Sequence, residues 1–158
     1  MNDRSRVLVS LRVAAPPERT FTVFTEEIGA WWRPNGLFRF TGREGTRLAF
    51  EPEPPEHLVE IGTDGSRFEI GPVLEWSPPS HLVFGWRQES FPDDRSTEVA
   101  VRFDAVHDGT RVTVEHFGWD AIPPANAARH GFPLGDLQQR LAEWWQALLA
   151  SLRAQLSG

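Results

Sequence analysis

One long amphipathic helix near the C-terminal end constrains the fold of this chain more than any other feature. The segment from Gly135 to Leu156 carries apolar residues at helical spacing, and a helix of that length spans about 33 Å. A compact chain of 158 residues has an expected radius of gyration of about 15 Å, so the helix must cross the whole molecule. Its apolar side chains occupy an arc of about 140°. Trp145 falls inside this arc and Trp144 at its edge, which predicts deeper burial for Trp145.

The rest of the chain predicts strands and turns around a second, broken helix. The N-terminal run RVLVSLRV alternates apolar and polar residues, and the following APPERTFTVFTEEIGAWW changes to helical spacing, where Gly29 is expected to split the helix. From Leu37 to Phe117, short alternating pieces such as FRF, TRLAF and HLVEI predict strands, with hairpin turns at Asp64-Gly65 and Asp108-Gly109. About seven strands are expected, joined mostly as an antiparallel meander.

The composition removes several catalytic mechanisms. All 16 basic residues are Arg, and the chain contains no Lys, Cys or Tyr. Schiff-base chemistry needs Lys, thiolate nucleophiles and Cys-ligated metal sites need Cys, and a tyrosine general acid needs Tyr. No HExxH motif or helical His pair is present either, so we expect no metal ion and no cofactor.

Charge and segment lengths indicate the partners and the location to expect. A net charge of −6 and a pI near 5.3 argue against nucleic acid as a partner, because phosphate binding needs a basic stripe. No apolar segment approaches the length of a membrane span, and the N-terminus has no long apolar stretch. The sequence therefore predicts one cytoplasmic domain over residues 1–158, and it leaves a homodimer open.

Several motifs resemble a known family. APPERTFTVFTEEIGAWW, GPVLEWSPPSHLVFGWR, GTRVTVEHFGW and the Trp-Leu-rich final helix are similar to the START-like helix-grip superfamily, also called SRPBCC. Within it they resemble the homologues of the heat-shock-protein-90 ATPase activator. The resemblance implies an α+β fold in which a curved antiparallel sheet of six to seven strands wraps a long C-terminal helix around a cavity, with short broken helices after the first strand. It also implies function classes that range from lipid carriers to polyketide cyclases.

Alternation and helical spacing give a candidate lining for that cavity. Two residues in the set are polar: His116, the one titratable side chain that strand alternation directs inward, and Gln138, which falls within the apolar arc of the helix. The candidates are Trp31, Trp32, Phe38, Phe40, Trp76, Phe84, Trp86, Val101, Phe103, Val114, His116, Gln138, Leu141 and Trp145. The same residues are also what plain core packing would require, so both interpretations stand at this point.

Three function classes remain open from the sequence. Binding of a small hydrophobic molecule in the cavity fits best, because large rings without hydroxyl groups dominate the candidate lining. A cyclase or aromatase using the same cavity would need converging acid and base groups, for which only His116, Gln138 and Arg87 are candidates. A stress-response module that contacts a chaperone is the third class. The connection from Gly118 to Pro133 is long enough to form a lid over the cavity.

Overall fold

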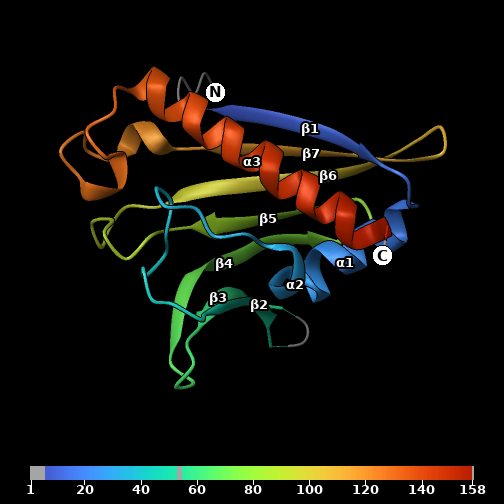
Figure 1. Cartoon of the computed structure of the whole chain (residues 1–158), viewed down its shortest axis with the longest axis horizontal. Helices are drawn as coiled ribbons and strands as arrows, with labels where there is room; N and C mark the ends of the chain where they lie inside the picture. Colours follow the sequence, from blue (N-terminus) through green and yellow to red (C-terminus); the bar gives the residue numbers. More distant parts are fainter. Residues whose placement is uncertain (1–5, 53–54, 158) are drawn as a thin grey trace.

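A curved sheet of seven strands and one long helix, α3 (Leu134–Ser157), make up most of the computed structural model, which describes residues 6–52 and 55–157 (Figure 1). The strands are β1 (Val7–Val13), β2 (Arg47–Glu51), β3 (His57–Ile61), β4 (Arg67–Ser77), β5 (His81–Trp86), β6 (Thr97–Val106) and β7 (Gly109–Phe117). The other helical segments are α1 (Pro17–Glu26), α2 (Ile28–Trp31) and the 3₁₀ turns η1 (Trp119–Ala121) and η2 (Ala127–Arg129).

The sheet is an antiparallel meander of β2 to β7, and the first strand, β1, forms the edge beside β7. Its spatial order is β1-β7-β6-β5-β4-β3-β2, and each neighbouring pair is antiparallel. Register shifts interrupt the β3/β4 pair after Leu58 and the β4/β5 pair after Val73. Bulges of this kind increase strand twist and bend the sheet. The predicted α+β class, the strand number and the meander are confirmed.

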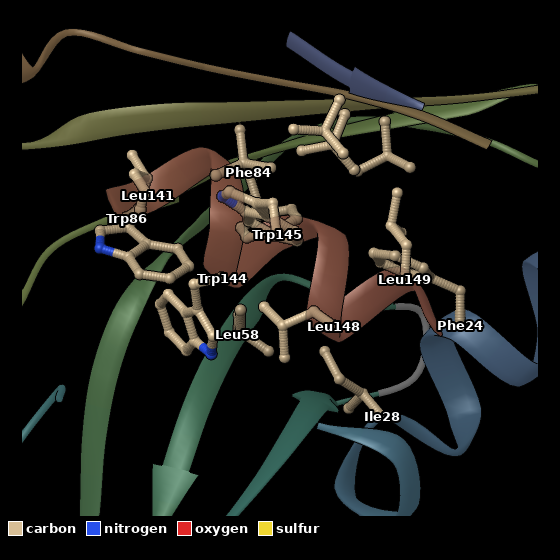
Figure 2. Packing of buried hydrophobic residues seen from close by; sticks show 14 of the residues in the cluster. Phe24, Ile28, Leu58, Phe84, Trp86, Leu141, Trp144, Trp145, Leu148 and Leu149 are labelled. Atoms are coloured by element: carbon tan, nitrogen blue, oxygen red, sulfur yellow. The ribbon is translucent and has the colours of Figure 1, made fainter. Parts of the chain in front are cut away.

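The long helix lies diagonally across the concave side of the sheet, and its C-terminal end reaches α1 and α2 (Figure 1). It spans Leu134–Ser157, close to the predicted bounds. Trp145 is 0 % exposed and Trp144 is 5 % exposed, so the order of burial follows the angular argument. Figure 2 shows the α3 side chains pointing at the sheet, with Trp86 and Phe84 opposite the two tryptophans.

The first helix breaks before the glycine that was expected to break it. Helix α1 ends at Glu26 and α2 begins at Ile28, so Gly29 lies inside α2. A Cβ atom at Gly29 would lie 3.1 Å from the carbonyl oxygen of Leu48. The glycine therefore lets α2 approach β2 closely, and the break itself falls at Glu27.

The predicted strand FRF is wrong. Phe38 and Phe40 lie in irregular backbone between α2 and β2, although both side chains are buried. Backbone N–H groups of this segment bind a side chain and not a neighbouring strand. The side-chain oxygen of Asn35 accepts hydrogen bonds from the N–H groups of Leu37 at 2.6 Å and Phe38 at 3.3 Å. The pattern FRF alternates because both phenylalanine rings are buried on the same side, and the segment does not pair with a strand of the sheet.

The β6/β7 hairpin turns one residue earlier than expected. Val106 pairs with Gly109, so His107 and Asp108 form the two-residue turn, with Asp108 at a φ of 59°. A Cβ atom at Gly109 would lie 2.0 Å from the carbonyl oxygen of Val13. This glycine is needed for the close approach of β1 to β7 and not for the turn.

Candidate functional site

Aromatic rings fill the space between α3 and the middle of the sheet. Trp86 lies 4.8 Å from His116 and 6.0 Å from Trp145, measured between ring centroids. Trp32 reaches into the same cluster, at 5.9 Å from Trp86 and 5.6 Å from Trp145. These separations are typical of aromatic pairs in direct contact. The rings that were candidates for a central cavity lining therefore touch one another.

His116 is the polar centre of this cluster. Its Nδ1 accepts the indole N–H of Trp145 at 3.2 Å, and its Nε2 lies 2.8 Å from the hydroxyl of Thr97. The Thr97 hydroxyl in turn donates to the carbonyl oxygen of Trp86 at 3.1 Å. Each ring nitrogen of His116 faces one indole N–H, that of Trp145 at Nδ1 and that of Trp119 at Nε2, so either neutral tautomer sets its ring N–H against one indole donor.

Burial keeps the imidazole neutral. His116 is fully buried, and desolvation lowers its pKa from 6.5 to about 3. The indole N–H of Trp119 also lies 3.2 Å from Nε2. With both ring nitrogens in contact with core groups, His116 holds the aromatic cluster together, which is the structural role that sequence reasoning weighed against a catalytic one.

A pocket opens at one end of the aromatic cluster, where the segment between α2 and β2 passes over α3. Its volume is about 290 Å³, at the lower end of the range for small-molecule sites. The lining consists of Gly29, Trp32, Pro34, Asn35, Phe38, Arg39, Phe40, Gly42, Arg43, Glu44, Gly45, Thr46, Arg47, Leu48, Glu60 and Trp144. We call this the α2–β2 pocket.

Four aromatic rings form the apolar part of the α2–β2 pocket. Phe38 stacks on Trp144 with an interplanar angle of 15° at 5.5 Å, and Trp32 meets Trp144 edge to face at 5.6 Å. Trp32 also lies 6.1 Å from Phe40. The indole N–H of Trp144 donates to the carbonyl oxygen of Arg33 at 3.2 Å, which fixes the orientation of that ring. The pocket thus offers rigid aromatic surface of low polarity.

Charged and hydroxyl groups form the opposite part of the pocket. The Glu60 carboxylate is buried and accepts hydrogen bonds from the hydroxyls of Thr41 and Thr46, the latter at 3.1 Å. Arginines 39, 43 and 47 line the same pocket, and all three are exposed. The site therefore combines an aromatic surface with a polar margin rich in guanidinium groups.

The structure brings only some of the predicted lining residues to this pocket. Trp32, Phe38 and Phe40 line it. Trp76 lies beside Phe21 in a separate surface pocket of about 560 Å³. The remaining apolar candidates are buried in the core with His116: Trp31, Phe84, Trp86, Val101, Phe103, Val114, Leu141 and Trp145.

The structure corrects two sequence-based expectations. Gln138 is half-buried at the start of α3, and its side-chain amide donates to the carbonyl oxygen of Arg6 at 3.2 Å, so it lies away from the aromatic cluster. Helical angle alone placed it inward, yet its amide reaches the backbone of the residue just before β1. The connection from Gly118 to Pro133 is docked in the core, since Trp119 and Ile122 are fully buried in it.

Sequence reasoning missed the charged half of the pocket. No periodic pattern singles out its residues, because Arg39 and Arg43 lie in the irregular segment after α2, Arg47 begins β2, and Glu60 lies in β3. Trp144 was also absent from the predicted lining. Its position at the edge of the apolar arc of the helix is the signal that could have placed it at the boundary of the core. The other signal is the regular spacing of the three arginines, four residues apart in a segment that contains Gly42 and Gly45, which could have indicated a cationic surface.

Among residues 6–52 and 55–157, no group of three or more His, Cys, Asp or Glu side chains is arranged to hold a metal ion. None of the helices in that part of the chain is long and apolar enough to cross a membrane.

Comparisons with known proteins relate the whole architecture to one family. The family model described as Activator of Hsp90 ATPase homolog 1-like protein matches residues 14–157. A protein of Mesorhizobium loti aligns with a TM-score of 0.64 at 16% identity over 96% of both chains. An HSP90 activator from Plasmodium falciparum aligns with a TM-score of 0.62 at 19% identity, again over 96% of both chains.

A third solved structure carries the family name. The AHSA1 protein from Silicibacter pomeroyi aligns with a TM-score of 0.58 at 18% identity, over 96% of this chain and 97% of that one. At these identities the structural likeness shows a shared fold. A search of curated protein sequences gave no match.

Proposed function

The chain belongs to the family of Activator of Hsp90 ATPase homolog 1-like proteins, and from this premise we propose that it binds a small hydrophobic molecule in the α2–β2 pocket. One observation carries the proposal. The aromatic cluster is closely packed everywhere around His116, yet at Trp32 and Trp144 it borders an open volume of about 290 Å³.

The indole of Trp32 supports this location. Trp31, its neighbour in the chain, is fully buried, and its N–H donates to the carbonyl oxygen of Phe24 at 3.2 Å. Trp32 is half-buried, and within the described residues its N–H has no hydrogen-bond partner. Buried indoles usually find a partner for this group. A bound molecule would cover the ring face and could accept the hydrogen bond.

A neutral fluorescent probe tests the proposal. N-phenyl-1-naphthylamine should bind saturably, with a rise in probe emission and quenching of tryptophan emission. Trp32→Leu should weaken this binding by about tenfold, because an aromatic contact of this kind contributes about 1.4 kcal/mol. Trp76→Leu is the matched control, since Trp76 is also half-buried but lines the other pocket.

The outcome distinguishes the pocket from non-specific adsorption. Binding that Trp32→Leu weakens and Trp76→Leu leaves unchanged supports the proposal. An absence of saturable binding, or equal weakening by both variants, overturns it. Melting curves of both variants show whether each one remains folded.

A second candidate function, contact with an Hsp90-type chaperone, is favoured by the family membership. It is tested by adding the purified chain to such a chaperone and measuring the rate of ATP hydrolysis. A saturable change in the rate supports this function, and an unchanged rate at concentrations well above that of the chaperone argues against it. The pocket variants separate the two functions, because surface contact with a chaperone does not require an open pocket at Trp32.

A further inference from the structure

We propose that the ligand of the α2–β2 pocket is an aromatic acid, a planar ring system carrying a carboxylate or sulfonate group, whose anion lies against Arg39 and Arg47. This inference rests on the proposed function, because it assigns a chemical class to the molecule bound in the same pocket. Its basis is the excess of hydrogen-bond donors and positive charge on one side of the aromatic surface.

Two of the three pocket guanidinium groups are available to a ligand. Arg43 donates to the hydroxyl of Ser66 at 3.0 Å. Arg39 lies in the irregular segment and Arg47 is the first residue of β2. Both line the pocket, and neither forms a hydrogen bond or ion pair within the part of the chain that the structure describes. Guanidinium groups bind planar oxyanions with two parallel hydrogen bonds.

Among the described residues, the two acidic groups of the pocket form no ion pair with these arginines and offset only part of their charge. The oxygens of Glu60 are engaged by the hydroxyls of Thr41 and Thr46. Glu44 lies exposed at the margin, without an ion pair to a described residue. Three arginines and two glutamates leave the pocket with one excess positive charge, whereas the whole chain has a net charge of −6. The net charge of the pocket is therefore opposite in sign to that of the whole chain.

The neutral polar groups of the pocket are also donors. The Asn35 side-chain oxygen is occupied by the backbone N–H groups of Leu37 and Phe38, so its amide N–H groups are what remain for a ligand. The Trp32 N–H is a second donor. A ligand that matches this set must supply several acceptor atoms, which an oxyanion does.

The aromatic and cationic parts belong to one small volume, which determines the shape of the ligand. Phe38 and Trp144 present nearly parallel rings at an interplanar angle of 15°, and Trp32 stands edge-on to Trp144. A flat ring system suits this surface, and a pocket of about 290 Å³ holds two or three fused rings but no long lipid. Ring and anion together define an aromatic acid.

Two probes that share one ring system test the inference. 1-Anilinonaphthalene-8-sulfonate carries a sulfonate, and N-phenyl-1-naphthylamine has the same rings without it. At low ionic strength the sulfonate should bind at least about tenfold more tightly, and added salt should weaken only its binding. The double variant Arg39→Gln/Arg47→Gln should remove this advantage, so that it binds the two probes about equally tightly.

A matched control removes the same charge elsewhere. Arg19→Gln/Arg153→Gln changes two exposed arginines that do not line the pocket, and it should leave both probes unaffected. If the neutral probe binds and the sulfonate binds no more tightly, the inference fails while the proposed function stands. Equal losses from the two double variants show a general effect of net charge and also overturn the inference. If neither probe binds, the proposed function itself fails.

Discussion

At the scale of single residues, one neutral imidazole organises the interior. The two ring nitrogens of His116 contact the indole N–H groups of Trp145 and Trp119 and the hydroxyl of Thr97, so one side chain joins three polar groups of the interior. Its alternation with Glu115 placed it inward from the sequence, and the structure agrees. The sequence could not show which groups would face it, because Thr97 and Trp145 come from β6 and α3, distant in the chain.

The low pKa of His116 makes stability depend on pH. In the unfolded chain the imidazole takes up a proton near its ordinary pKa of 6.5, whereas in the folded chain the pKa is about 3. The unfolded state therefore binds more protons between these values, and stability falls as pH falls through that window. The slope is about 1.4 kcal/mol per pH unit. Above pH 7 the group contributes no pH dependence.

His116→Gln isolates this effect, because glutamine keeps a donor and an acceptor but does not titrate. Denaturant unfolding at pH 7.5 and pH 5.0 should show that the original chain loses about 2 kcal/mol more than the variant over this range. Equal losses in both proteins would mean that His116 is not held neutral in the folded state.

At the scale of elements, α3 holds the sheet and the two short helices together. Its apolar face packs along β1, its Trp145 reaches His116 of β7, and its C-terminal half contacts α1 and α2 (Figures 1 and 2). Helical periodicity was enough to predict its bounds and the order of burial of its two adjacent tryptophans. It did not predict which partners they meet: Trp145 reaches His116, and Trp144 stacks on Phe38 at the pocket.

Truncation of these two tryptophans separates stability from binding. Trp145→Ala should destabilise the fold by about 3–5 kcal/mol, because it leaves a cavity in the core and removes a hydrogen bond to His116. Trp144→Ala should cost clearly less and should weaken binding of the neutral probe. Denaturant melts that give equal losses, or a larger loss for Trp144, would refute the assignment of these roles.

The close approach of β1 to β7 gives a test on a different element. Gly109→Ala should destabilise the fold by about 1–3 kcal/mol, because its Cβ would lie 2.0 Å from the Val13 carbonyl oxygen. Gly135→Ala is the control, since no atom lies within 4 Å of a Cβ there. In thermal melts the control should be neutral or slightly stabilising. A neutral Gly109→Ala would show that the two strands separate without cost.

At the scale of the whole molecule, the fold was predictable and the site was largely not. The alternation in β1 and β7 and the helical spacing of α3 extend over many residues, and the motif resemblance covers most of the chain. Together they were enough to predict the meander and the long helix. The pocket depends on irregular backbone between α2 and β2, where Phe38 and Phe40 imitated a strand. Three lining residues were named in advance, whereas the arginines and Glu60 meet there only through the tertiary fold.

The central claim is that a ligand occupies the α2–β2 pocket and not the middle of the aromatic cluster. Indole N–H signals in a nitrogen–proton correlation spectrum test it directly, since the chain has seven tryptophans and each gives one signal. On titration with N-phenyl-1-naphthylamine, the signals of Trp32 and Trp144 should shift most, and those of Trp119 and Trp145 should stay nearly constant. The largest shifts at Trp119 and Trp145 would place the ligand beside His116 and contradict the account.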